Sequence, residues 1–506
     1  MTRHAVQEGL KSIVVTGPGA EAAAVAVALG VSLGGREIKI TLVTPSAGRS
    51  SAGVARIRGG ESGFHSRLGV DEQELMRATC GVYSLGTRFS GFAGPNESIF
   101  VPLGKHGMTI RLVPFHQYWC NLCAADEYGQ YNEYSLPAAS AARGRFVPPK
   151  SANDPVNATV TYDLLVDLDL YALFFVKLAG KLGITILNDS VSAATVGPDG
   201  QIEQLQLAGG AAIDGDFFID CLSERLPIDA LGGASCFEDW SEWLPCNRIL
   251  SVLTRKQREP ALFTSIKAVD QGWLQRNTLQ NFTVESLTCC NDYLDDTGAR
   301  QILEESLPHS SLSSVEQTTY RCGRFRASWI GNCVAIGSAA IAIEALNVSS
   351  LQLAQNAVLR LLAMLPVRGE SAMLAQEFNR VTAEEHIGVR DYAILHYQLA
   401  IRPSTPFWLK CRNARVPDTI VRRLELYREN GRISTGENEW FGADDWLSCM
   451  INFGVLPEKS DPLVAMAESQ QVRSSMLAFR ETVRQIAEAQ DSGAVPAVLN
   501  DWPLAP

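Results

Sequence analysis

The sequence of 506 residues predicts an α/β protein built on a Rossmann-like sheet. Residues 12–30, SIVVTGPGAEAAAVAVALG, place a β-branched run before a tight glycine turn and a helix of small residues. Much later, residues 217–221 (FFIDC) form a buried apolar run, and residues 331–346 (GNCVAIGSAAIAIEAL) repeat the strand-and-turn pattern. This order is typical of a dinucleotide-binding module whose distant segments join one sheet.

The first turn is a candidate phosphate cradle. Gly17 and Gly19 would let the backbone approach a pyrophosphate held on the N–H groups of the helix start, and Ala22 takes the third glycine place. A second strand follows at residues 38–43, and the residue after it usually carries a carboxylate for the ribose. That residue is Thr44 here, so an ordinary β-α-β unit whose nucleotide site has decayed remains an alternative.

The remaining segments divide the chain into two interwoven modules. Apolar spacing predicts helices over residues 72–80, 168–184 and 351–365, alternation predicts β-hairpins before residue 217, and the last 130 or so residues are mainly helical. A late turn around Gly337 would lie near a flavin, with the next helix start facing the ring. We expect an FAD-binding module (1–120, 160–235 and 315–370) and a mainly helical substrate module (121–159, 236–314 and 371–506).

Composition narrows the partners. A net charge of −11 argues against nucleic acid and against an anionic membrane surface. No apolar run is long enough to span a bilayer and no secretory core segment opens the chain, so a cytoplasmic location is expected. Cys120 and Cys123 form a lone C-x-x-C without a second pair or nearby histidines, and we expect no metal site.

Several collinear motifs resemble the flavin-dependent tryptophan halogenases. They cover nearly the whole chain and include RPSTPFWLKCR and DDWLSCMINFGVLPEKSDPL near the C-terminus. The other matching segments are DEQELMRATCGVYSLGTRF (71–89), FFIDCLSERL (217–226), FEDWSEWLPCNRIL (237–250) and GRFRASWIGNCVAIGSAAIAIEAL (323–346). The resemblance implies an FAD module of the flavin monooxygenase/halogenase type, reduced FAD from a separate flavin reductase, and a small aromatic substrate. A homodimer is left open.

The resemblance also places the family's chemistry on particular residues. In that family an oxidised halogen meets a lysine, and a glutamate assists at the substrate. Ser84 stands at the lysine position and Asn347 at the glutamate position. Serine offers no amine nucleophile, and asparagine is no general base near neutral pH. Asn347 could instead cap the helix that follows.

The other family positions fall on a second set of residues. The halide pair becomes Ser349 and Ser350, the substrate clamp becomes Val101 and Leu103, and the GWxWxIP barrier keeps Gly272 and Trp273. Trp446 matches a substrate-pocket tryptophan.

Two kinds of function compete. One is a divergent flavin-dependent halogenase or monooxygenase that acts on an indole or another aromatic substrate but is not an efficient tryptophan halogenase. The other is a catalytically inactive protein of the same fold that serves as a binding or partner protein. A NAD(P) dehydrogenase is disfavoured by the collinear motifs.

Overall fold

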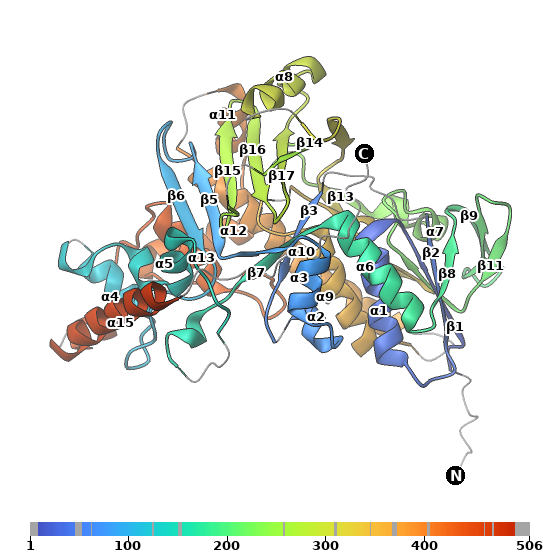
Figure 1. Ribbon diagram of the computed structural model, residues 1–506, viewed down its shortest axis with the longest axis horizontal. Coiled ribbons are helices and arrows are strands. Elements are labelled where there is room, and N and C mark those ends of the chain that lie inside the picture. The colour runs from blue at the N-terminus through green and yellow to red at the C-terminus, as the bar shows by residue number, and fades with distance from the viewer. Residues whose placement is uncertain are drawn as a thin grey trace, which may run out of the picture.

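A six-stranded sheet organises the N-terminal part of the protein (Figure 1). The computed structural model describes residues 9–45, 53–61, 63–123, 126–149, 154–256, 259–307, 311–344, 346–366, 372–401, 405–459, 461–467 and 470–490. In spatial order the strands are β20 (Trp329–Ile330), β21 (Cys333–Ala335), β12 (Phe217–Asp220), β1 (Ser12–Thr16), β2 (Lys39–Thr44) and β8 (Thr185–Asn188). Only the β20–β21 pair is antiparallel.

Three helices cover this sheet. Helix α1 (Gly19–Leu33) packs between α6 (Leu168–Lys181) and α9 (Ser350–Ala363). Its alanines and valines are almost wholly buried, because small side chains let the helices and the sheet approach closely. The predicted union of residues 12–30 with residues 331–346 in one sheet is confirmed, since β12 separates β1 from β21.

Smaller sheets surround the first one. The predicted hairpins appear as β9 (Val191–Val196), β10 (Ile202–Leu207) and β11 (Ala212–Asp214) at the edge of the molecule (Figure 1). A second sheet contains β3 (Val54–Arg58), β7 (Asp163–Asp167) and β4 (Val82–Ser84). A third contains β13 (Phe237–Asp239), β19 (Gly323–Phe325) and β22 (Ile341–Ala342).

A seven-stranded sheet is the main feature that the sequence analysis did not anticipate. Residues 248–289 lie within the module expected to be mainly helical, yet they fold into long strands that β5 and β6 extend. In order the strands are β18 (Glu316–Thr319), β14 (Arg248–Arg255), β17 (Phe282–Cys289), β16 (Gly272–Thr278), β15 (Thr264–Val269), β5 (Gly86–Ser90) and β6 (Ser98–Pro102). The sheet therefore joins segments from both expected modules.

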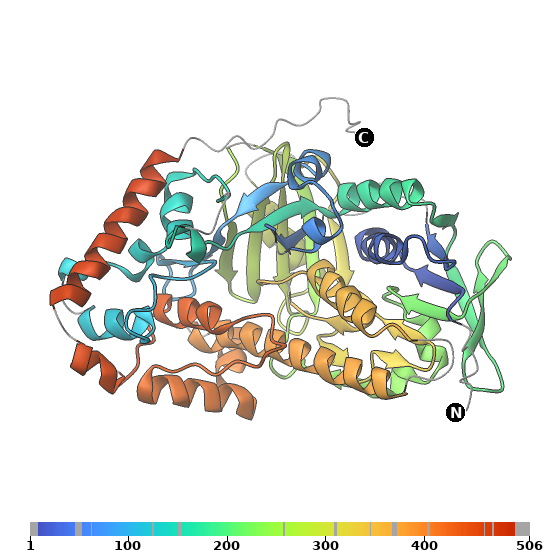
Figure 2. The same cartoon turned by 90° about the horizontal axis from the view of Figure 1, so that it is seen from below.

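The C-terminal helices pack against the seven-stranded sheet and its neighbours. The long α10 (Ala372–Leu399) contacts β20 near its start and α11 (Pro406–Asn413) near its end, and so runs lengthwise through the molecule (Figure 2). The other C-terminal helices are α12 (Asp418–Asn430), α13 (Ala443–Asn452), α14 (Pro462–Ala467) and α15 (Gln470–Ala489). The remaining α-helices are α2 (Phe64–Arg67), α3 (Glu72–Ala78), α4 (Phe115–Leu122), α5 (Leu136–Arg143), α7 (Leu226–Ala230) and α8 (Asp296–Ser306). Within the described residues, no helix is long and apolar enough to cross a membrane.

Candidate functional site

The glycine turn after β1 has the geometry that its sequence predicts. Gly17 and Gly19 have φ angles of +145° and +73°, which L side chains rarely adopt. A Cβ on Gly17 would lie 2.8 Å from the Cys221 carbonyl oxygen, so the turn also needs glycine for strand packing. Its N–H donates to the Val43 carbonyl at 3.1 Å. Ala22 is buried in the helix interior, as expected.

A carboxylate lies across the mouth of this turn. Glu21, in the first turn of α1, accepts hydrogen bonds from Ser338 N at 2.8 Å and Ser338 Oγ at 3.0 Å. Ser338 belongs to the 3₁₀ turn η5 (Gly337–Ala339) that follows β21. Burial raises the pKa of Glu21, and hydrogen bonds from Ser350 and Ser338 oppose that shift.

Gly337 lies directly beneath this carboxylate. Its φ angle is +63°, and a Cβ built on it would meet Glu21 Oε2 at 2.2 Å. The open face of a glycine at the carboxyl edge of a parallel sheet is where a cofactor approaches the backbone. In this protein the Glu21 side chain takes that approach.

Thr44, at the position where the fold would contact a ribose, carries no charge. Thr44 ends β2, is 4% exposed, and directs its hydroxyl to the Pro45 carbonyl at 3.5 Å. Arg56 and Arg58 could have compensated by contacting phosphates, but both side chains bind protein groups instead. With Glu21 and Thr44 as they stand, the described residues of the glycine turn and of β2 fit FAD poorly at its phosphate and ribose ends.

Ser84 lies in a different sheet, at the end of β4. It is fully buried, and its Oγ donates to the Gly86 carbonyl at 3.3 Å. Its register partner on the neighbouring strand β7 is Asp163. On the other side of β7, Arg58 of β3 is also in register with Asp163. Arg58 Nε donates to Asp163 Oδ1 at 2.8 Å, so the serine stands beside an ion pair.

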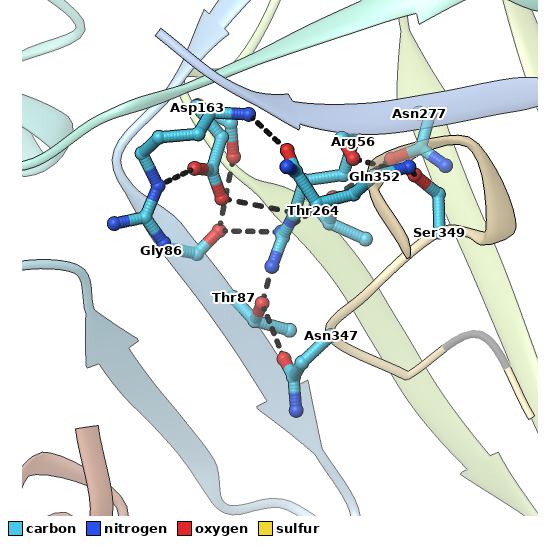
Figure 3. Close-up of polar contacts among 11 residues, drawn as sticks. Arg56, Gly86, Thr87, Asp163, Thr264, Asn277, Asn347, Ser349 and Gln352 are labelled. Carbon is cyan, nitrogen blue, oxygen red and sulfur yellow. Dashed lines mark hydrogen bonds and ion pairs between the residues drawn. The ribbon is translucent and has the colours of Figure 1, made fainter. Parts of the chain in front are cut away.

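Arg56 lies at the head of a buried polar chain that the sequence analysis did not predict. Its guanidinium, 10% exposed, donates through Nη2 to Thr87 Oγ1 at 3.0 Å and to Thr264 Oγ1 at 2.9 Å (Figure 3). It also donates to the same Gly86 carbonyl as Ser84, at 3.2 Å. Alternation in Val54–Arg58 could have put both arginines on one strand face, but it could not have identified their partners.

Asn347 continues this polar chain. Its Oδ1 accepts from Thr87 Oγ1 at 3.1 Å (Figure 3). Its Nδ2 lies 3.0 Å from His396 Nε2. His396 Nδ1 donates to the Tyr392 carbonyl at 2.8 Å, because a carbonyl can only accept. Burial lowers the pKa of His396 to about 4, so its Nε2 accepts from the amide. Asn347 is therefore held at both ends in one orientation.

Asn347 does not cap the following helix. Ser349 does: its Oγ accepts from Gln352 N at 3.2 Å and donates to the Arg56 carbonyl at 2.6 Å. Ser350, its expected halide partner, is the first residue of α9 and hydrogen-bonds Glu21. The two serines thus face different neighbours.

A small cavity of about 30 Å³ adjoins the polar chain. Its walls include Arg56, Thr264, Asn277, Asn347 and Ser349. Such a volume holds one or two waters or a small ion rather than an aromatic ring.

A second carboxyl group lies three residues before Asn347. Glu344 is buried and accepts from Tyr397 Oη at 2.6 Å and from Cys246 N at 2.8 Å. Burial raises its pKa to about 8. The segment around Asn347 therefore meets α10 through uncharged groups at neutral pH.

The expected substrate residues lie in the packed interior. Trp446, on α13, is fully buried, and Arg423 stacks over its ring at 4.2 Å. Trp273, on β16, is also buried, with Tyr397 at 5.8 Å between ring centroids. Val101 lies in β6, which α13 contacts, and Leu103 N donates to the Leu85 carbonyl. Both tryptophan indole nitrogens are buried without a hydrogen-bond partner.

The two thiols of the C-x-x-C pair lie in one turn, where one of them hydrogen-bonds to the backbone. Cys123 Sγ donates to the Cys120 carbonyl at 3.3 Å, and burial raises the pKa of Cys120 to about 12. Among the described residues no cluster of metal-ligating side chains occurs.

The fold is that of the flavin-dependent halogenases. It superposes on BrvH, a flavin-dependent halogenase from Brevundimonas sp. BAL3, with a TM-score of 0.88, 30% identity, and coverage of 96% of this chain and 97% of that one. Xcc4156, a flavin-dependent halogenase from Xanthomonas campestris, gives a TM-score of 0.88 at 28% identity and 95% coverage of both chains.

Sequence comparison identifies the family. The tryptophan halogenase family model matches residues 12–469, so this chain belongs to that family. Tryptophan 7-halogenase KtzQ of Kutzneria sp. (strain 744) is 25% identical over 445 residues, covering 83% of this chain and 82% of its own. Tryptophan 7-halogenase RebH of Lentzea aerocolonigenes is 24% identical over 496 residues, covering 90% and 92%.

Proposed function

We propose that this chain is a divergent flavin-halogenase-family protein that does not halogenate tryptophan efficiently. The observation that carries the proposal is the state of Asn347. Its amide accepts from Thr87 and donates to a neutral His396, so it has no capacity to take a proton from an aromatic ring. Ser84, at the other proposed catalytic position, is buried and bonded back to Gly86.

The role that follows is that of a binding or partner protein built on an enzyme scaffold. The buried, mutually packed Trp446 and Tyr392 support this role, because their rings fill the space between α13 and α10. The hydrogen-bonded Glu21 supports it from the cofactor side.

The test is a direct assay with reduced FAD, oxygen, chloride or bromide, and a panel of indoles and phenols, read by mass spectrometry. A tryptophan 7-halogenase at equal concentration is the positive control. General acid–base help is worth about 10²–10⁴-fold, so we expect tryptophan turnover at least about a hundredfold below the control. Regiospecific chlorotryptophan at a rate within about tenfold of the control would refute the proposal.

A second candidate function is retained chemistry on another aromatic substrate. Arg56 favours it, because a cation lies on the cavity that Asn347 and Ser349 also line. A cation there could orient a small oxidised anion as the missing lysine would. Halogenated phenols or hydroxylated indoles in the same assay, lost in Arg56→Lys while folding is kept, would support this candidate.

A further inference from the structure

Two turns meet at the carboxyl edge of the six-stranded sheet. Strands β1, β12 and β21 run parallel, so the turns after β1 and β21 meet at the same edge. The first turn of α1 and the turn η5 bound this region, which we call the phosphate locus: the space at Gly337 and Ser338 that the Glu21 side chain reaches. In doubly wound sheets a dinucleotide places its phosphates at such a locus, on free backbone N–H groups.

Glu21 fills the phosphate locus with a carboxyl group of the chain itself. Its Oε2 accepts hydrogen bonds from both the backbone N–H and the hydroxyl of Ser338. The same oxygen lies 2.2 Å from the position of a Cβ built on Gly337, so it also takes the space that the glycine leaves open. Through Ser350 the carboxyl group reaches the start of α9 as well. One side chain thus ties three backbone turns together.

We propose that Glu21 stands in for the cofactor's phosphate and thereby sets a low affinity of this chain for FAD. A phosphate entering the locus would have to break the Glu21–Ser338 hydrogen bonds and displace the carboxyl group from Gly337. This inference concerns cofactor binding alone. It holds whether or not the chain halogenates tryptophan.

The experiment compares FAD binding by the full-length wild type, Glu21→Ala, Glu21→Gln and Glu37→Gln, followed by quenching of FAD fluorescence. Glu37 is an exposed carboxylate of the same β-α-β unit, before the start of β2 and hence at the opposite edge of the sheet, so its variant controls for net charge. We expect Glu21→Ala to bind FAD at least about tenfold more tightly than wild type, since it frees both the donors and the space. Glu21→Gln should gain about threefold, and Glu37→Gln should match wild type.

Inorganic pyrophosphate supplies a second measurement without the flavin. We expect it to raise the melting temperature of Glu21→Ala and to leave that of wild type unchanged. Circular dichroism establishes folding, and if the alanine variant is unfolded the glutamine variant decides the question. Equal FAD affinities among the folded proteins, whether all tight or all weak, would overturn the proposal. So would pyrophosphate stabilisation of wild type equal to that of the variant. A failure of the halogenation proposal would appear in product analysis and would leave these titrations unchanged.

Discussion

The phosphate locus and the Asn347 junction satisfy their polar groups in different ways. At the phosphate locus, the Glu21 carboxyl group accepts from the backbone N–H and the hydroxyl of Ser338. At the junction between β5 and α10, Asn347 joins a hydroxyl to a neutral imidazole, and Glu344 nearby is held protonated by burial. In both regions the named polar groups find hydrogen-bond partners within the chain.

The two regions pair their polar groups by different means. Buried polar groups are costly when unpaired, so such a region is stable only where each group finds a partner. The chain Arg56–Thr87–Asn347–His396 provides these partners at the junction. At the phosphate locus one side chain, Glu21, provides them for Ser338.

The largest expected effect is the pH dependence that Glu344 imposes on stability. Its pKa rises from 4.5 in the unfolded chain to about 8 in the fold. The stability it contributes is fully present below about pH 4.5 and is lost as the pH rises through about 8. Glu344→Gln removes this dependence. Between about pH 5 and pH 8.5 the free energy of unfolding of the variant, relative to wild type, should rise by about 3–5 kcal/mol.

Urea unfolding followed by tryptophan fluorescence at the two pH values measures this change. Glu304→Gln, an exposed carboxylate on α8, is the matched control and should show a constant difference. A pH-independent difference for Glu344→Gln would mean that Glu344 is ionised in the fold, and the junction would then carry a buried negative charge.

The next effect is the cost of removing the cation at the head of the junction. Arg56→Met leaves the Thr264 hydroxyl and the Gly86 carbonyl without this donor, and leaves Asp163 with one cation fewer. Because these groups are largely buried, we expect a loss of about 2–4 kcal/mol in the free energy of unfolding. Arg36→Met, on the exposed turn after α1, should change it by less than about 0.5 kcal/mol. A negligible effect of Arg56→Met would show that the chain of hydrogen bonds starts at Thr87.

The start of the six-stranded sheet could be predicted from the sequence because its signals are local. A β-branched run, a glycine turn and a small-residue helix specify β1 and α1 within 22 residues, Ser12 to Leu33. The seven-stranded sheet was missed because its strands carry polar and charged residues on both faces. Arg276 and Glu285, for example, pair across β16 and β17. Such cross-strand pairs satisfy each other only in the fold, so they hide the alternation that marks a strand.

The site could be predicted only as a set of positions. Ser84, Asn347 and Ser349 do lie near one another, through Gly86, Thr87 and Arg56. The role of Arg56 depends on Thr87 and Thr264, which are 31 and 208 residues away in sequence, and no local pattern announces such contacts. Glu21 was overlooked because an acidic residue in a first helical turn is common and stabilising by itself.

A smaller effect is expected when Asn347 becomes charged. Asn347→Asp removes the Nδ2 donor, so His396 can bond to the new carboxylate only by taking a proton. We expect the pKa of His396 to rise from about 4 to above its ordinary value of 6.5. At about pH 8 the variant should lose about 2 kcal/mol of stability.

The sign of the pH effect distinguishes wild type from Asn347→Asp. In wild type, the stability contributed by neutral His396 is lost as the pH falls from 6.5 through about 4. In the variant, the stability contributed by the ion pair is lost as the pH rises through the raised pKa of His396. NMR titration of the His396 ring measures this directly, with Asn281→Asp in the exposed β16–β17 turn as the control. An unshifted His396 would mean that the amide does not donate to it.

The smallest effect concerns the ribose end of the crevice. Thr44→Glu places a carboxylate after β2, where a charge-assisted hydrogen bond to a ribose hydroxyl becomes available. Thr44 is largely buried, so the cost of burying the new charge offsets part of the gain. We expect FAD to bind about tenfold more tightly, about 1.4 kcal/mol, when Glu21 is already alanine.

In the wild-type background the same substitution should gain much less. With Glu21 in place, the phosphates cannot settle on the Ser338 donors, and a ribose contact that depends on their position is not reached. FAD titrations of wild type, both single variants and the double variant form a cycle whose coupling measures this dependence. Strict additivity would show that the ribose and phosphate ends bind independently. Glu21 would then lower the affinity for FAD without changing the position in which FAD binds. A gain in FAD affinity from Thr44→Glu that is larger in wild type than in Glu21→Ala would contradict the expected dependence of the ribose contact on the phosphate position.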